Sequence, residues 1–397
     1  MGIKMQKIKN FLQQETVLCI AAVLAAISTF FVKPDRQYLS YIDFRTLAIL
    51  FCLMTIIAAF KQIGIFDKLA TTLLKKVHTT SGAVFVLVLL CFTLSMFITN
   101  DVALITFVPL SILVIQRIRF STSADRNHCL ITCAIMQTIA ANLGSMLTPI
   151  GNPQNLFLYG KANETGTLTL FQFMGLMLPY CLLSLILLIL WILLFRSRSE
   201  NMVRVCTLSV DLQQESPSEK GHSSNTKEFF VTYLFLFILS LLAVAHKISF
   251  MIPLILVLLY SLLRNHKVMK DVDYSLLATF LALFVFIGNL GRIPLFETAL
   301  CQILEGRELL TAVLASQVMS NVPAAVLLSR FTENTNALII GTNLGGLGTL
   351  IASMASLISF KYIAREDSAL RGKYIVSFTA ANVIFLAALL LLSILLA

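Results

Sequence analysis

The chain has 397 residues, of which 58% are hydrophobic and only 13% are charged, and its mean hydropathy is +0.87. Soluble domains are about half apolar and about a quarter charged, so this composition excludes a soluble globular protein. It predicts an all-α polytopic membrane protein in contact with lipid. The net charge of +10 does not indicate nucleic-acid binding, because the Lys and Arg residues lie in short segments between apolar stretches.

The cysteines and polar residues give no sign of catalysis. The eight cysteines are scattered without a CxxC motif, which indicates free thiols. Cys129 and Cys133 follow His128 at helical spacing, but small residues that face the core explain this pattern better than a metal site. No pair of a nucleophile and a base lies in the apolar stretches. We therefore expect neither an enzyme nor a cofactor.

The first half of the chain, residues 1–195, predicts two spans, an amphipathic segment, a hairpin, a broken span and a closing span. These elements lie, in chain order, at 17–32, 46–60, 61–78, 81–115, 129–158 and 171–195. The start of the chain also resembles a signal peptide, but its apolar run has a counterpart in the second half, which favours a first span. The stretch 81–115 is interrupted by Thr99, Asn100 and Asp101, so we expect it to enter and leave the membrane on one side.

A polar linker at 196–228 and a connecting helix at 229–246 separate this half from residues 247–397. The linker is too polar to form a core, so we expect it to be mobile and cytoplasmic. The second half predicts the same six elements, at 249–263, 275–290, 292–306, 308–330, 337–360 and 374–397. Its hairpin is interrupted by Ser320 and Asn321. The prediction is about nine full spans plus two hairpins, each span needing about 20 apolar residues.

The distribution of positive charge sets the expected orientation. Cytoplasmic loops carry an excess of Lys and Arg. We expect the protein in the inner (cytoplasmic) membrane, with its N-terminus in the cytoplasm. The excess of Lys and Arg then falls on the cytoplasmic side only if both interrupted stretches are hairpins. The first then opens to the cytoplasm and the second opens outward, which is typical of two inverted repeats.

A short motif supports the repeat. Asn142-Leu143-Gly144, followed by Thr148, recurs as Asn343-Leu344-Gly345, followed by Thr349, at an offset of 201 residues (343 − 142). Because the halves are inverted, the two hairpin tips and the two broken spans are expected to converge near the middle of the membrane.

The predicted substrate site combines both hairpin tips with the broken spans. Each second hairpin arm begins just after its tip, so free N–H groups and the positive end of a helix dipole favour an anion. The residues expected to contact the substrate are Thr99, Asn100, Asp101, Asn155, Ser320, Asn321, Thr349 and Ser353. The alternative is that the tip residues only cap the helices that follow.

Exposed carbonyl groups and amides in the broken spans could hold a small cation, and we expect no metal other than sodium. The residues expected to bind the coupling ion, Na+ or H+, are Asp101, Asn142, Gly144, Ser145, Thr148, Asn152, Asn343, Gly345 and Gly346. For the two Asn-Leu-Gly motifs the alternative is close helix packing by small residues.

Asp101 is the one ionisable side chain inside a predicted membrane segment. Such residues are expensive in lipid and usually functional. Asp101 could carry a proton or neutralise a bound cation. The alternative is a carboxylate that only stabilises the N-terminus of a helix.

These motifs resemble the ion transporter superfamily over essentially the whole chain. That superfamily includes divalent-anion:sodium symporters, citrate carriers, arsenite permeases and sodium/proton antiporters. Its symporters carry Ser-Asn-Thr at both tips, where this chain has Thr99-Asn100-Asp101 and Ser320-Asn321-Val322. Asp101 and Val322 replace both threonines, which argues against a dicarboxylate. The resemblance implies a homodimer in which a transport domain moves like an elevator along a fixed scaffold, with the amphipathic segments as lateral arms.

The expected function is ion-coupled transport of a small anion or organic acid across the cytoplasmic membrane. The alternative is efflux, either of arsenite or of sodium in exchange for protons, with Asp101 as the proton carrier.

Overall fold

The computed structural model describes residues 15–77, 79–118, 120, 122–199 and 223–396. Within these ranges the chain is helical and contains no strand. Residues 200–222 of the predicted linker lie outside the described residues; α10 continues to Ser199 and α11 begins at Ser223.

The α-helices, in chain order, are α2 (Thr16–Phe31), α3 (Tyr38–Tyr41), α4 (Phe44–Gln62), α5 (Ile65–Leu74), α6 (Thr80–Leu94), α7 (Asn100–Arg117), α8 (Ser123–Ser145), α9 (Pro153–Glu164), α10 (Leu170–Ser199), α11 (Ser223–Val244), α12 (Met251–Arg264), α13 (Tyr274–Leu290), α14 (Pro294–Leu304), α15 (Glu308–Met319), α16 (Asn321–Leu328), α17 (Thr335–Leu344), α18 (Met354–Glu366) and α19 (Arg371–Leu396). Two 3₁₀ turns, η2 (Val268–Asp271) and η3 (Ser368–Leu370), complete the described elements.

This architecture confirms an all-α polytopic membrane protein. In the described part of the chain, five helices are long and apolar enough to cross a membrane: α4, α7, α10, α11 and α19. The pair α13 and α14 adds a sixth if it is one span bent by 101°. Several other predicted spans consist of helices that are too short to cross a membrane alone, so the number of full spans stays a prediction.

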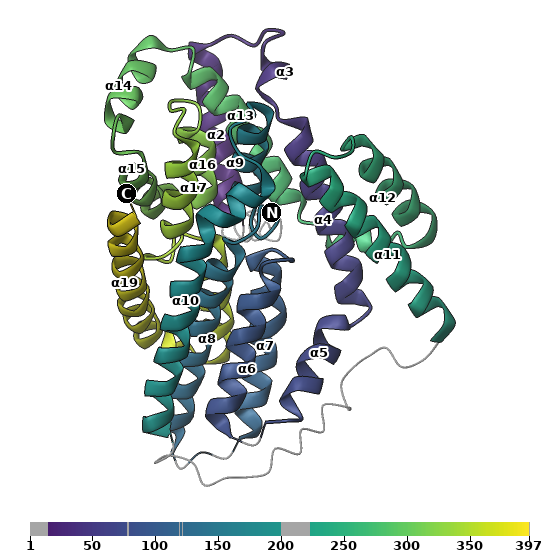
Figure 1. Ribbon diagram of the computed structural model, residues 1–397, viewed down its shortest axis with the longest axis vertical. Helices are drawn as coiled ribbons and strands as arrows, with labels where there is room; N and C mark the ends of the chain where they lie inside the picture. Colours follow the sequence, from purple (N-terminus) through teal and green to yellow (C-terminus); the bar gives the residue numbers. More distant parts are fainter. Residues whose placement is uncertain (1–14, 78, 119, 121, 200–222, 397) are drawn as a thin grey trace, which may run out of the picture.

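We group the helices by their main packing contacts, and Figure 1 shows α11 and α12 lying apart from α6, α8 and α10. One group contains α2, α4 and α11–α13, in which α2 packs on α13 and α4 packs on α11 and α12. The other contains α6–α10 and α15–α19. The hydrophobic window of α4 is 72% buried, whereas that of α19 is only 22% buried, so α4 is an inner helix and α19 offers its apolar side chains to lipid.

Polar side chains fix where several helices begin. Asp43 accepts a hydrogen bond from the N–H of Thr46 at 2.9 Å and thereby caps α4. Asp273 caps α13 in the same way through Leu276, also at 2.9 Å. Such caps satisfy N–H groups that have no partner within the helix.

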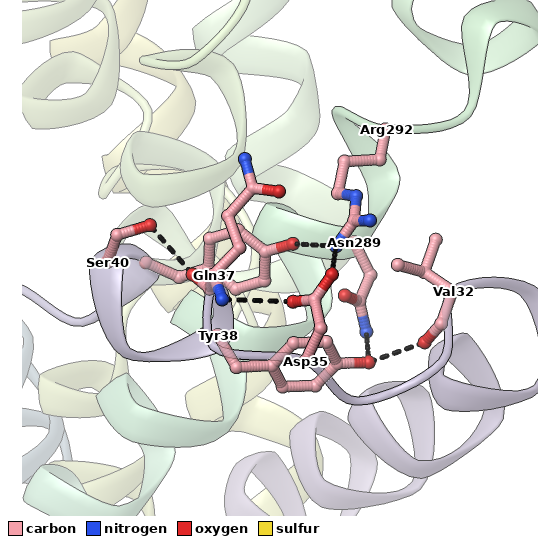
Figure 2. A network of polar contacts seen from close by, with 8 residues as sticks. Val32, Asp35, Gln37, Tyr38, Ser40, Asn289 and Arg292 are labelled. Atoms are coloured by element: carbon pink, nitrogen blue, oxygen red, sulfur yellow. Dashed lines mark hydrogen bonds and ion pairs between the residues drawn. The ribbon is translucent and has the colours of Figure 1, made fainter.

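The loop between α2 and α4 is bound to the end of α13 (Figure 2). The Asn289 amide donates to the hydroxyl of Tyr38 at 2.8 Å, and Arg292 forms an ion pair with Asp35 at 2.8 Å. A Cβ on Gly288 would lie 2.2 Å from the ring of Tyr41, so only glycine allows this close approach. These contacts hold α2, α3 and α13 together as one unit.

A second polar cluster joins the two groups of helices. Arg45 of α4 donates to the carbonyl of Ala243 at the end of α11, at 2.6 Å. His246, in the loop after α11, packs edge-on against Tyr159 of α9, with ring centroids 6.0 Å apart. Burial and the charge of Arg45 lower the pKa of His246 to about 4. The imidazole is therefore neutral at physiological pH.

Candidate functional site

Each hairpin tip is bound through its backbone to one of the breaks between helices. The N–H of Asn100, at the start of α7, donates to the carbonyl of Gly151 at 3.1 Å. The N–H of Asn321, at the start of α16, donates to the carbonyl of Ala352 at 3.0 Å. Gly151 lies between α8 and α9, and Ala352 lies between α17 and α18. Equivalent contacts thus join each tip to the break in its own half of the chain.

A second pair of contacts repeats in the same way. The hydroxyl of Thr148 donates to the carbonyl of Met96, and the hydroxyl of Thr349 donates to the carbonyl of Gln317 at 3.4 Å. The two acceptors lie 221 residues apart (317 − 96), the same offset as Asn100 and Asn321. The threonines differ in environment, because Thr148 is half-buried and Thr349 is exposed.

The glycines of the two Asn-Leu-Gly motifs allow this docking. A Cβ on Gly144 would lie 2.1 Å from the carbonyl oxygen of Phe92 in α6. A Cβ on Gly345 would lie 2.6 Å from the hydroxyl of Ser316 in α15. Both glycines therefore serve close packing between a broken span and the first hairpin arm, which is the packing alternative for these motifs.

Side-chain amides join the two halves of the chain. Asn142 accepts hydrogen bonds from Asn100 at 3.0 Å and from Ser353 at 3.1 Å. Asn343 donates to Asn155 at 2.6 Å and accepts from Asn152 at 3.1 Å. We call these six residues the asparagine network: Asn100, Asn142, Asn152, Asn155, Asn343 and Ser353. All six side chains are buried, with at most 5% exposed.

The remaining predicted residues lie around this network. Ser145 accepts from Asn152 at 3.2 Å. The Asn321 amide lies against Gly346, whose Cβ would be 3.0 Å from its nitrogen. Thr99 is buried and precedes α7, but its side chain does not cap that helix. The capping alternative does not hold for Thr99.

The two tips differ in backbone conformation. Ser320 has φ of 75° and ψ of 155°, a region that is essentially restricted to glycine. Its counterpart Thr99 has φ of −61° and ψ of 150°, which is ordinary extended backbone. Strain of about 1–3 kcal/mol persists only where surrounding contacts hold it. Here the bond from Asn321 to Ala352 and a 3.5 Å contact from the Ser320 hydroxyl to the same carbonyl hold the second tip.

Asp101 lies in the first turn of α7, next to the network. Its backbone N–H donates to the side-chain oxygen of Asn100 at 3.0 Å. Its Oδ1 atom is buried and has no hydrogen-bond partner. A carboxylate oxygen in this position lacks the partners that normally compensate for burial, so it is suited to bind a proton or a cation.

Gln317 is a contact residue that the sequence reasoning missed. Its amide nitrogen donates to the carbonyls of Gly345 at 2.9 Å and Leu347 at 2.8 Å, and its oxygen accepts from the N–H of Thr349 at 2.9 Å. The Gln317 amide therefore occupies carbonyl groups of the second break, which is where the sequence predicts a cation site. The signal was a carboxamide side chain in the otherwise mostly apolar second part of α15, three positions before Ser320.

The side chains of the asparagine network are buried, with at most 5% exposed. Two grooves of the described part of the chain lie elsewhere, one of about 450 Å³ between α8 and α19 and one of about 520 Å³ beside α14.

Comparison with known proteins agrees with this arrangement. A family model described as citrate transporter matches residues 11–337. An uncharacterized transporter of Methanocaldococcus jannaschii is 36% identical over 321 residues, covering 81% of each chain. The inner membrane protein YbiR of Escherichia coli is 29% identical over 346 residues, covering 85% of this chain and 86% of its own.

A shorter similarity links the chain to the P protein of mouse, 32% identical over 151 residues, which covers 36% of this chain and 17% of that protein. The family match confirms the resemblance to the ion transporter superfamily, and the protein is a multi-pass membrane transporter. The chain belongs to the citrate transporter family.

Proposed function

We propose that the protein is an ion-coupled secondary transporter that moves a small anion or organic acid across the cytoplasmic membrane. The observation that carries this proposal is the docking of each hairpin tip, at Asn100 and Asn321, onto the helix break of its own half. Helices α7 and α16 begin at these tips, so two positive dipole ends lie next to the asparagine network. This combination favours an anion held between amide donors.

Inverted repeats supply the framework for this site. The equivalent contacts at the two tips support the repeats, with Gly151 and Ala352 accepting from Asn100 and Asn321. We place the first repeat at residues 1–195 and the second at 247–397, joined by the linker at 196–228 and the connecting helix at 229–246. Residues 200–222 of that linker lie outside the described part of the chain.

An elevator movement would expose the buried asparagine network. In this proposal α2, α4 and α11–α13 form the scaffold of a homodimer in the inner membrane, with the N-terminus cytoplasmic. The second group of helices, α6–α10 and α15–α19, carries the substrate, and α5 and α14 act as lateral arms. The contacts of Asn289 and Arg292 with the loop before α4 support a rigid scaffold.

The test is uptake into proteoliposomes under imposed sodium or proton gradients. Labelled citrate, succinate, phosphate and sulfate form the anion panel. Gradient-dependent uptake of at least one anion is expected. Absence of gradient-dependent movement for every anion in the panel would contradict the proposal.

Efflux remains a second proposal, either of arsenite or of sodium in exchange for protons. The buried, unpartnered Oδ1 of Asp101 favours it. Asp101→Asn keeps the side-chain size but removes the acid, so proton-dependent transport should be lost. Retention of pH-dependent transport by this variant would remove Asp101 from the mechanism.

A further inference from the structure

Two hydrogen bonds connect α8 and α18 at different depths. At the asparagine network, the Ser353 hydroxyl donates to the Asn142 side-chain oxygen at 3.1 Å. One turn before Asn142 in α8, the hydroxyls of Thr138 and Ser359 are hydrogen-bonded at 2.7 Å, with Ser359 as donor because the Thr138 proton goes to the Ala134 carbonyl at 2.7 Å. All four side chains are buried. The pairs form the two ends of a polar strip between the helices.

Two polar atoms within this strip lack partners. Ser356 lies three residues from both Ser353 and Ser359, so helical geometry places it on the same side of α18. Its hydroxyl oxygen is buried without a hydrogen-bond partner, and so is the side-chain nitrogen of Asn142. Buried polar groups are nearly always satisfied by protein or by internal water.

The other half of the chain shows what a satisfied version of this arrangement contains. At the offset of 201 residues, Ser356 corresponds to Asn155 and Asn142 corresponds to Asn343. The Asn343 nitrogen donates to the Asn155 oxygen at 2.6 Å, which closes that side. Serine has a short hydroxyl where asparagine has a longer carboxamide. In the pair of Asn142 and Ser356 the Asn142 nitrogen therefore has no side-chain oxygen within hydrogen-bond distance.

The next position along the strip differs in the same sense. Thr138 and Ser359 correspond to Ile339 and Leu158 at the same offset. Both of the latter side chains are buried and apolar. The strip is therefore polar toward the face where α7 ends and apolar toward the opposite face.

Tyr374 extends the polar strip further within the protein. Its side chain lies beside Thr138 and Ser359 and is fully buried. The Tyr374 hydroxyl has no hydrogen-bond partner within bonding distance. The preceding residue, Lys373, lines the groove of about 450 Å³ between α8 and α19, together with Asn127 of α8. The polar groups thus extend from the asparagine network to Tyr374, in the direction of a groove at the predicted cytoplasmic face.

We propose that internal water binds at the unpartnered groups of this strip, between the Asn142 nitrogen and the Ser356 hydroxyl and at the Tyr374 hydroxyl, and completes a proton-conducting path from the asparagine network toward this groove. Water fits because it both donates and accepts, whereas the Asn142 N–H₂ group would repel a cation. Each hydroxyl along the path accepts one proton and releases another. One proton therefore enters for each that leaves, and every group ends neutral. The use of this path in ion coupling rests on the proposed transport function, but its hydration does not.

The test compares two buried cysteines at equivalent positions. Ser359→Cys lies in the polar strip, and Leu158→Cys lies at its apolar counterpart. The infrared S–H band added by each cysteine is followed after transfer of the purified protein into D₂O. We expect exchange at Ser359→Cys to be at least about tenfold faster than at Leu158→Cys, because a dry buried thiol exchanges only through local opening. Equal exchange rates would overturn the proposal. Ser356→Cys serves as a second probe of the polar strip.

A fourth substitution separates the path from the transport function. Ser356→Asn restores the side chain found in the other half and should slow exchange at Ser359→Cys to the rate at Leu158→Cys. Unchanged fast exchange would contradict the assignment of water to this position. In proteoliposomes loaded with the pH dye pyranine, the same variant should slow any proton uptake driven by citrate. Fast thiol exchange in a protein that shows no citrate-driven signal would count against citrate as substrate and leave the path intact.

Discussion

Ser353 and Asn142, which lie in opposite halves of the chain, are joined by a hydrogen bond of 3.1 Å between two buried side chains. Asn142 also accepts from Asn100 at the first hairpin tip, so one amide oxygen connects the first tip, the first broken span and the second broken span. Movement at the tip therefore changes the packing of both halves.

Ser353→Ala should destabilise the protein by about 1–3 kcal/mol, the usual cost of leaving a buried partner unsatisfied. The measurement is thermal unfolding in detergent. Ser377→Ala, at an exposed position of α19, is the matched control and should leave the midpoint unchanged. Equal midpoints for both variants would show that the bond to Asn142 contributes nothing.

Gly144→Ala should be strongly unfavourable because its Cβ would lie 2.1 Å from a backbone oxygen, which cannot move aside as a side chain can. Overpacking of this kind costs about 1–3 kcal/mol or more. Gly175→Ala in α10 is the control, since no atom lies within 4 Å of its Cβ position. Removal of a glycine from a helix interior stabilises by up to about 1 kcal/mol. The two variants should therefore shift the unfolding midpoint in opposite directions.

Gln317→Ala should free the carbonyls of Gly345 and Leu347 in the second break. Loss of these bonds should lower stability by about 1–3 kcal/mol in sodium-free buffer. If carbonyls at this break can hold a cation, sodium should then stabilise the variant more than the wild type. A sodium titration of the unfolding midpoint checks this, and identical responses in both proteins would mean that these carbonyls do not bind sodium.

His246 should make the fold sensitive to acid. Its pKa is lowered to about 4, by burial first and by Arg45 second, while an imidazole in the unfolded chain titrates near about 6.5. Above about pH 6.5 neither state is protonated, so this residue contributes no pH dependence. As the pH falls toward about 4, the unfolded state binds a proton that the folded state refuses, and stability decreases.

The corresponding measurement is the unfolding midpoint of His246→Gln at about pH 7 and about pH 5. The variant should lose less stability than the wild type between these values. His266→Gln, at an exposed position, should retain the wild-type dependence. An unaltered pH dependence in His246→Gln would show that acid sensitivity arises from other groups.

The sequence reveals those features of the site that need particular residue types. Polar interruptions mark the tips at Asn100 and Asn321, because unsatisfied backbone cannot face lipid and its neighbours must supply hydrogen bonds. The repeated Asn-Leu-Gly motif marks the breaks after Asn142 and Asn343 for the same reason. These positions could be chosen without coordinates, although their role in binding is still a prediction.

Other features depend on which atoms meet in three dimensions. The amide of Gln317 binds carbonyls about 30 positions later, and no local pattern predicts that pairing. The positive φ of Ser320 follows from contacts with the second broken span and not from a glycine in the sequence. Likewise, the unpartnered atoms of Asn142 and Ser356 become visible only when the two halves are compared in space.

The central claim is that Asn100 and Asn321 hold the transported anion between the two hairpin tips. Its most direct measurement is gradient-driven uptake of the anion panel by proteoliposomes containing Asn100→Ala, Asn321→Ala or the exposed control Ser377→Ala, each first checked for folding by its unfolding midpoint. Uptake should fall at least about tenfold in both tip variants, since loss of about 1.4 kcal/mol of binding changes an equilibrium tenfold, and should stay at the wild-type level in the control. Wild-type uptake by correctly folded Asn100→Ala and Asn321→Ala would contradict the claim.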